Sequence, residues 1–144
     1  HWAGVNVEEA KQIAEIVEPV FRGLDREEIV VLYFDTKMKP IGMEIVAIGG
    51  TKACIVETSN IFKGAIAANA TAIAMIHNHP SGSISPSKQD FYMTNQMAMA
   101  GELLGIPLVD HLILGRKDFY SFKKEHPGVR LSEVEQIPRK SCED

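Results

Sequence analysis

The hydrophobic positions of this chain follow two periods, and each predicts a different kind of element. Apolar residues at three- and four-residue intervals predict helices, whereas dense runs of β-branched and aromatic residues predict buried strands. The helical pattern occurs at residues 7–24, 59–70 and 86–104. Strand patterns occur at residues 29–34, 41–48, 71–76, 108–114 and 119–122, with a further short one at 53–56. The order αββαβαββ predicts an α/β (α+β) fold, in which helices pack on a mixed sheet.

Polar residues, glycine and proline indicate where the helices begin and end. Asn6 is a candidate N-cap of the first helix, Pro19 is expected to kink or end it, and Gly23 is expected to stop it. Pro86 is expected at the first position of the third helix, where its missing N–H has no consequence.

The length of 144 residues suits one domain, which we expect at residues 1–125, followed by a polar tail at residues 126–144. The net charge of -4 gives no electrostatic argument for nucleic-acid binding, because phosphate contacts need a basic surface. We expect no membrane span, since no apolar run approaches the roughly 18 residues that a span requires. The two cysteines form no C-x-x-C pair, which favours a reducing, cytoplasmic location.

One polar segment between a predicted strand and a predicted helix carries the residue types of a metal site. His77 and His79 are two residues apart in extended chain, so their side chains point the same way. Asp90 lies in the first turns of the next helix, which a strand–loop–helix connection can bring beside the strand end. Two imidazoles and one carboxylate suit zinc, and three protein ligands leave a fourth position for water. We therefore predict one Zn²⁺ ion at His77, His79 and Asp90.

Glu44 interrupts an otherwise apolar strand pattern and is the candidate for proton transfer. A carboxylate there costs free energy unless it faces solvent, a partner or an activated water. A metal-dependent hydrolase needs such a group to move protons in the transition state. The pattern thus predicts Glu44 as the general acid/base.

Each of these residues also has a purely structural interpretation. Two histidines in a loop are often solvated, and Glu44 could lie on the solvent face of an edge strand. Ser87 and Asp90 have the S-x-x-D spacing of a helix cap. Capping explains neither His77 and His79 nor Glu44, so their convergence favours the metal site.

The Asp110-His111 step in the predicted strand at 108–114 fits two interpretations equally well. A buried pair of this kind could orient a metal-ligating imidazole from behind. It could equally be a hydrogen-bonded core pair with a structural role.

The spacing of the metal-site residues resembles the JAMM motif, in which a glutamate precedes H-x-H-P, a serine and an aspartate. Here these are Glu44, the run from His77 to Pro80, Ser87 and Asp90. The text HNHPSGSISPSKQD, with DHLI and YSF further on, is similar to the RadC branch of the JAB/MPN superfamily. The resemblance covers residues 25–122.

This resemblance implies the cytidine-deaminase-like three-layer fold of JAB/MPN domains, with zinc on the two histidines and the aspartate. It implies that Glu44 is the general acid/base and that Ser87 stabilises the oxyanion. The expected reaction is attack of metal-activated water on an amide or isopeptide bond of a protein or peptide substrate. Glu44 is placed only by counting back from Gly50, and Glu57 is the fallback.

Two other classes of function compete with a hydrolase. One is a binding module in DNA repair or mobile-element biology without peptidase activity, to which only the family label points; an open metal position argues against it. The other is a nuclease, but such enzymes usually have carboxylate-rich magnesium sites, and this set of ligands is rich in nitrogen.

Overall fold

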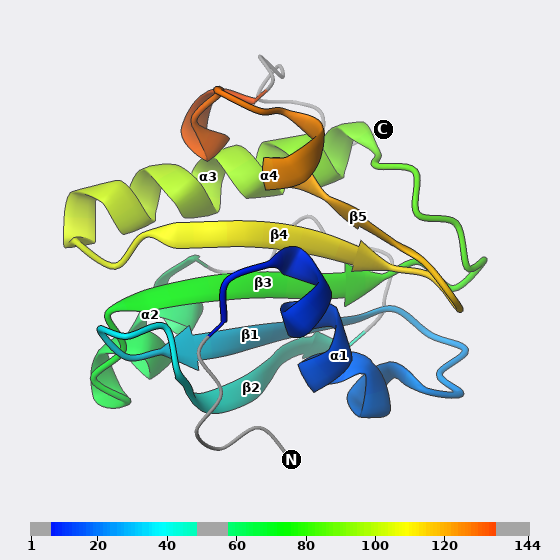
Figure 1. Cartoon of the computed structure of the whole chain (residues 1–144), viewed down its shortest axis with the longest axis horizontal. Coiled ribbons are helices and arrows are strands. Elements are labelled where there is room, and N and C mark those ends of the chain that lie inside the picture. Colours follow the sequence, from blue (N-terminus) through cyan, green and yellow to red (C-terminus); the bar gives the residue numbers. More distant parts are fainter. Residues whose placement is uncertain (1–6, 49–57, 135–144) are drawn as a thin grey trace.

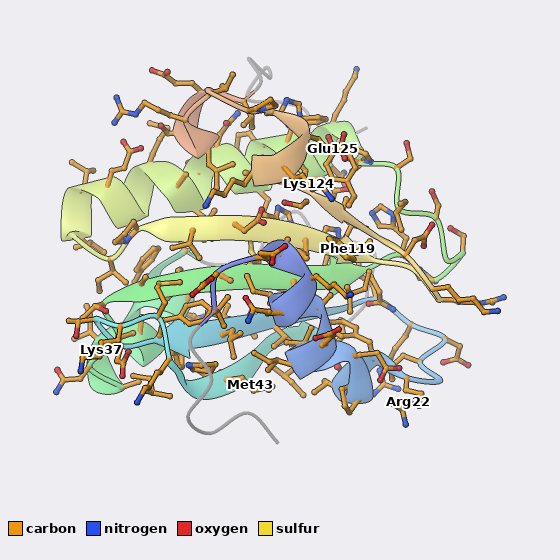
Figure 2. All side chains as sticks on the ribbon, viewed as in Figure 1. Arg22, Lys37, Met43, Phe119, Lys124 and Glu125 are labelled. Carbon is orange, nitrogen blue, oxygen red and sulfur yellow. The ribbon has the colours of Figure 1, made fainter. Side chains whose placement is uncertain are left out.

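Figure 1 shows a computed structural model of the chain, which describes residues 7–48 and 58–134. Five strands form one mixed sheet in the order β2-β1-β3-β4-β5. The strands are β1 (Glu28–Phe34), β2 (Pro40–Ile48), β3 (Ala72–Asn78), β4 (Leu108–Leu114) and β5 (Phe119–Ser121). β3 and β4 are parallel, and the other neighbouring pairs are antiparallel. Met43 on β2 and Phe119 on β5 mark the two edge strands in Figure 2.

Helices cover both faces of the sheet, which gives three layers. The helix α1 (Ala10–Phe21) packs on one face, and α2 (Thr58–Ala67) and α3 (Lys88–Leu104) pack on the other. Figure 1 shows α1 crossing in front of the strands. Every residue of β1 and β3 is buried, since both strands are covered on both faces. The predicted α/β fold with a mixed sheet is confirmed.

The first helix begins later than its hydrophobic pattern predicts. Val7 is buried, and its backbone N–H donates to the carbonyl of Met38 at 2.8 Å, so it docks on the β1–β2 turn instead of entering the helix. The N-cap is Glu9, whose N–H donates to Gln12 Oε1 at 2.9 Å. The predicted cap, Asn6, lies outside the described residues.

The end of the first helix agrees better with the sequence. Pro19 lies in its last turn, and α1 ends two residues further on at Phe21. Gly23 follows with a φ of 77°, a left-handed conformation that glycine adopts without strain.

Two predicted boundaries near the candidate site are wrong by one or two residues. β3 continues to Asn78, because β4 supplies parallel partners for it, with His77 opposite Ile113 and Asn78 opposite Leu114. The third helix begins at Lys88 after the N-cap Ser87, so Pro86 precedes the cap and is not the first helical residue.

The C-terminal part of the chain adds two short helices, α4 (Phe122–Glu125) and the 3-10 helix η2 (Leu131–Glu133). Phe122, predicted as strand, is the first residue of α4, because the Ser121 hydroxyl accepts from Lys124 N and caps that turn. Glu102 of α3 accepts hydrogen bonds from Arg130 and Ser132. The chain therefore lies on α3 as far as η2, and the domain limit at residue 125 stays a prediction.

Two predicted features concern other parts of the chain. The short strand at 53–56 lies outside the described residues. None of the helices in the described ranges has the length and apolar character needed to cross a membrane.

Gly101 allows α3 to approach the loop that leads into β4. A Cβ atom there would lie 2.5 Å from the Ile106 carbonyl oxygen and 3.2 Å from Leu108 N, both backbone atoms that cannot rotate away. We expect Gly101→Ala to lower the free energy of unfolding by about 1–2 kcal/mol, although alanine favours a helix by about 1 kcal/mol. Urea unfolding followed by circular dichroism measures the change.

Gly42→Ala is the matched control for this prediction. A Cβ at Gly42 would make an ordinary contact of 3.5 Å with the Tyr33 ring, so the change should stay within about 0.5 kcal/mol. Equal stability of the two variants would contradict the proposed tight contact at Gly101.

Candidate metal centre

The three predicted metal ligands meet where β3 ends and α3 begins. His77 is the penultimate residue of β3, in the middle of the sheet, and is fully buried. His79 follows the strand, and Asp90 lies in the first turn of α3. One ligand atom from each of the three lies within 4.8 Å of the others, so this group could hold a metal ion.

The carboxylate of Asp90 lies between the two imidazoles. Its Oδ1 is 3.0 Å from His77 Nε2, and its Oδ2 is 3.0 Å from His79 Nε2. The same carboxylate caps its own helix, since Ser87 N donates to Asp90 Oδ2 at 2.8 Å and Asp90 N donates to Ser87 Oγ at 3.2 Å. The helix-cap interpretation and the metal-site interpretation are thus compatible, because capping fixes the orientation of the carboxylate.

Each imidazole is held through its Nδ1, which leaves Nε2 to face Asp90. His79 Nδ1 lies 2.9 Å from the Ser83 carbonyl, which can only accept, so this nitrogen carries a hydrogen. His77 Nδ1 lies 2.8 Å from His111 Nε2. Metal-ligating histidines typically donate a hydrogen bond from the ring nitrogen that does not bind the metal to an acceptor in the protein.

His77 Nε2 provides a direct test of whether these residues suit a cation. The atom is buried and makes no hydrogen bond among the described residues, although Asp90 Oδ1 is only 3.0 Å away, because the two are not aligned for one. A buried nitrogen without a partner costs free energy, and a cation between the imidazole and the carboxylate would satisfy it. The residues therefore fit a metal ion.

The electrostatics of the group favour a negative Asp90. Burial alone would raise the pKa of this carboxyl, but the contacts with His77 and His79 outweigh it and hold the pKa far below its usual range. The hydrogen bond to Asp90 raises the pKa of His79 in the metal-free protein. Burial lowers the pKa of His111 well below its usual value, which keeps that ring neutral.

Glu44, the predicted acid/base, shares a face of the sheet with His77 but does not join the metal group. Glu44 pairs with Val31, and His77 pairs with Ile29; both partners belong to the core beneath α2 and α3. One strand, β1, therefore separates Glu44 from His77, and with an offset of two residues along the strands their Cα atoms lie about 12 Å apart.

The Glu44 carboxylate accepts a hydrogen bond from the Tyr33 hydroxyl, and both groups lie against Gly64 of α2. Burial and this contact raise the pKa of Tyr33. Tyr33 is further from the His77 end of the sheet than Val31 is, so the carboxylate leans away from the metal group. The fallback residue, Glu57, lies outside the described residues.

Asp110 and His111, adjacent in sequence, have different environments. Asp110 accepts hydrogen bonds from the Ser121 hydroxyl at 2.6 Å and from Lys123 N at 3.0 Å, and so holds the β5–α4 segment to β4. Burial raises the pKa of its carboxyl. His111 instead contacts His77, as described above.

Two further residues at the centre were not predicted from the sequence. Thr94 lies 2.5 Å from His111 Nδ1, and its position four residues after Asp90, on the same helix face, was the available signal. Asn78, between the two histidines, accepts from Glu28 N at 2.8 Å and donates to the Arg26 carbonyl at 3.0 Å. Its amide fixes the start of β1 beside the metal group, and no sequence pattern signals this contact.

A groove of about 460 Å³ opens beside His79. The loop after β3 forms one wall, the end of α1 with Phe21 and Leu24 forms another, and Arg116, whose side chain lies near Gly82 of that loop, also lines the groove. Apolar and charged groups are both available to a bound molecule.

Comparison with known proteins places this arrangement in a family. Residues 7–128 match the model of the RadC-like JAB domain. A UPF0758 protein of Thermotoga maritima is 40% identical over 102 residues, which are 71% of this chain and 46% of that protein. A UPF0758 protein of Carboxydothermus hydrogenoformans is 45% identical over 100 residues, which are 69% of this chain and 44% of that protein.

A third relative is similar to this chain over a slightly longer stretch. A UPF0758 protein of Methanosarcina mazei is 37% identical over 115 residues, which are 80% of this chain and 50% of that protein. The chain spans about half the length of these curated relatives. With the matched family model and the three-layer mixed sheet, these similarities show that the chain belongs to the RadC-like JAB domain family.

Proposed function

We propose that this domain is a zinc-dependent hydrolase that cleaves an amide or isopeptide bond in a protein or peptide substrate. The observation that carries the proposal is the orientation of His77 Nε2 and His79 Nε2 toward the same carboxylate of Asp90, with His77 Nε2 lacking a hydrogen bond. Such an arrangement has little structural purpose without a cation, because it leaves a buried nitrogen unsatisfied.

The ligand set favours zinc among the common biological cations. Two imidazole nitrogens and one carboxylate oxygen suit Zn²⁺, whereas Mg²⁺ and Ca²⁺ prefer oxygen ligands. A zinc ion with three protein ligands keeps an open position, where it activates water and polarises a carbonyl group.

Glu44 is the proposed proton carrier. It is exposed on an edge strand, so its side chain is free to rotate once it releases the Tyr33 hydroxyl. From the same face of the sheet as His77, it would accept a proton from the attacking water and donate one to the leaving amine.

Ser87 is the proposed oxyanion stabiliser. Its Oγ accepts from Asp90 N, so the hydroxyl keeps its own hydrogen for donation. The residue is exposed at the N-terminus of α3, where the helix dipole also favours a negative charge. The groove beside His79 offers apolar walls and Arg116 to an extended peptide.

The contact of Glu44 with Tyr33 favours a second candidate, a binding module without peptidase activity. In that case Glu44 would have the structural task of satisfying the buried Tyr33 hydroxyl. The two candidates differ in whether Glu44 affects turnover.

We expect wild-type protein purified without chelator to contain about one zinc per chain and His77→Ala/His79→Ala protein to contain almost none. Inductively coupled plasma mass spectrometry measures the zinc content. His126→Ala is the matched control, because His126 lies outside the metal group and bonds to the Tyr120 hydroxyl. Equal zinc in wild type and the double variant would overturn the site.

Glu44→Gln should lower kcat for hydrolysis by about 10²–10⁴-fold while leaving the zinc content unchanged, because the amide cannot carry the proton. The assay uses the zinc-loaded chain with a fluorogenic peptide library and an isopeptide-linked substrate. Glu102→Gln, which alters a carboxylate on the far part of α3, is the control and should retain activity. Equal turnover by wild type and Glu44→Gln would favour the binding module.

His79 should contribute stability to the metal-free protein that is lost as the pH rises through its raised pKa, opposite in sign to the contribution of His111, whose pKa is lowered. Because the folded-state pKa is higher than the unfolded one, the stabilisation is complete below the ordinary histidine pKa and disappears above the raised value. Urea unfolding of chelated protein between about pH 5 and 8 measures it. The stability of His79→Gln protein relative to wild type should therefore increase with pH over that range, and a pH-independent difference would contradict the assignment to His79.

A further inference from the structure

Four groups form a continuous chain of contacts behind the metal-facing side of His77. His77 Nδ1 lies 2.8 Å from His111 Nε2, and His111 Nδ1 lies 2.5 Å from Thr94 Oγ1. The Thr94 hydroxyl is in turn 2.8 Å from the backbone carbonyl of Asp90. The contacts thus begin at one ligand, His77, and return to the helix turn that carries another, Asp90.

The hydrogen atoms in this series of contacts can be arranged in two ways. In the first, Thr94 donates to the Asp90 carbonyl, His111 Nδ1 donates to Thr94, and His77 Nδ1 donates to His111 Nε2. In the second, Thr94 donates to His111 Nδ1 and no longer to the Asp90 carbonyl, which can only accept, and His111 Nε2 donates to His77 Nδ1. The first arrangement leaves His77 Nε2 with a lone pair, and the second places a hydrogen on it.

The geometry of His77 Nε2 favours the first arrangement. A hydrogen on this buried atom would need an acceptor, and Asp90 Oδ1, although 3.0 Å away, is not aligned to accept it. A lone pair there needs no acceptor, and a cation between it and the negative Asp90 carboxylate would attract both, in place of the repulsion between the two atoms. The first arrangement also supplies every hydrogen in the chain with an acceptor, including that of Thr94 on the Asp90 carbonyl.

Burial and packing restrict the rotation of both rings. His111 is fully buried and stacks on Phe122, with ring centroids 4.7 Å apart and planes at 9°. His77 is also fully buried. The two histidines lie on neighbouring parallel strands, where His111 of β4 pairs with Met75 and His77 of β3 pairs with Ile113. Thr94 is buried on α3 with its hydroxyl between His111 and the helix backbone.

We propose that His111 and Thr94 are positioning residues that fix the tautomer of His77, so that the neutral ring carries its hydrogen on Nδ1 and directs the lone pair of Nε2 toward a divalent cation. The inference rests on the proposed metal site and names the residues that prepare it. A site prepared in this way binds zinc without first breaking a hydrogen bond or moving a proton from His77. His79 needs no such series of hydrogen bonds, because the Ser83 backbone carbonyl fixes its Nδ1 hydrogen directly.

The tautomer can be measured without metal. In ¹⁵N-labelled, chelated wild-type protein, long-range ¹H–¹⁵N spectra should show hydrogen on Nδ1 and none on Nε2 for both His77 and His111. In Thr94→Val protein the acceptor for His111 Nδ1 is lost, so the hydrogen should move to His111 Nε2 and, by the reversed chain, to His77 Nε2. Hydrogen on His77 Nε2 in the wild type would overturn the proposal.

Zinc affinity provides the second readout. In competition with a chromophoric chelator, Thr94→Val should bind Zn²⁺ about 10–100-fold more weakly than wild type. Thr94→Ser is the matched control, because it keeps the hydroxyl and should bind within about threefold of wild type. Valine is close to threonine in shape, and circular dichroism confirms that both variants are folded.

Substitutions of His111 test the same chain from its middle. Glutamine can accept from His77 through Oε1 and donate to Thr94 through Nε2, so His111→Gln should retain most of the affinity, whereas His111→Leu should lose it. Failure of wild-type protein to bind zinc would overturn the metal site itself. Equal zinc affinity of wild type, Thr94→Val and His111→Leu would overturn the proposed role of His111 and Thr94 and leave the metal site standing.

Discussion

The placement of the Asp90 carboxylate is the constraint on which the candidate site depends. One oxygen faces His77, and the other faces His79 and the backbone N–H of Ser87. A carboxylate at the first turn of a helix is stabilised by the helix dipole and by capping, so its position does not depend on a bound ion. The same interactions that begin α3 therefore aim a ligand at the end of β3.

The sheet supplies the other half of this arrangement. His77 lies on a strand that is paired on both sides, with Ile29 on β1 and Ile113 on β4. Pairing on both sides restricts the movement of the strand backbone. The orientation of the buried imidazole therefore depends on the side chains packed around it. The parallel neighbour β4 provides His111, and α3 provides Thr94, so the contacts behind the site come from three rigid elements. Binding sites on rigid elements hold their geometry more closely than sites on loops.

The outer part of the site has more freedom. Glu44 is exposed on the edge strand β2, and its contact with Tyr33 is made by a side chain that can rotate. Ser87 is exposed at the helix start. Two of the three proposed ligands, His77 and Asp90, are thus held by packed elements, while the groups proposed to act on substrate lie at the surface, where a substrate can reorganise them.

The sequence by itself determined the order of elements, the mixed sheet, and the candidate ligands His77, His79 and Asp90. Periodicity and turn residues are local properties, and the ligands lie within one strand–loop–helix connection. The element limits were less predictable. Val7 left its helical pattern for a contact with Met38, and β3 gained Asn78 from pairing with β4, because tertiary hydrogen bonds outweigh local propensity.

Only the tertiary structure decided which neighbours these residues have. His111 contacts His77 while adjacent Asp110 binds Ser121, because successive strand residues face opposite sides of the sheet. The bond between Glu44 and Tyr33 likewise depends on the β1–β2 register. Local sequence patterns determine residue type and spacing, but contacts across strands and layers depend on how the whole sheet is assembled.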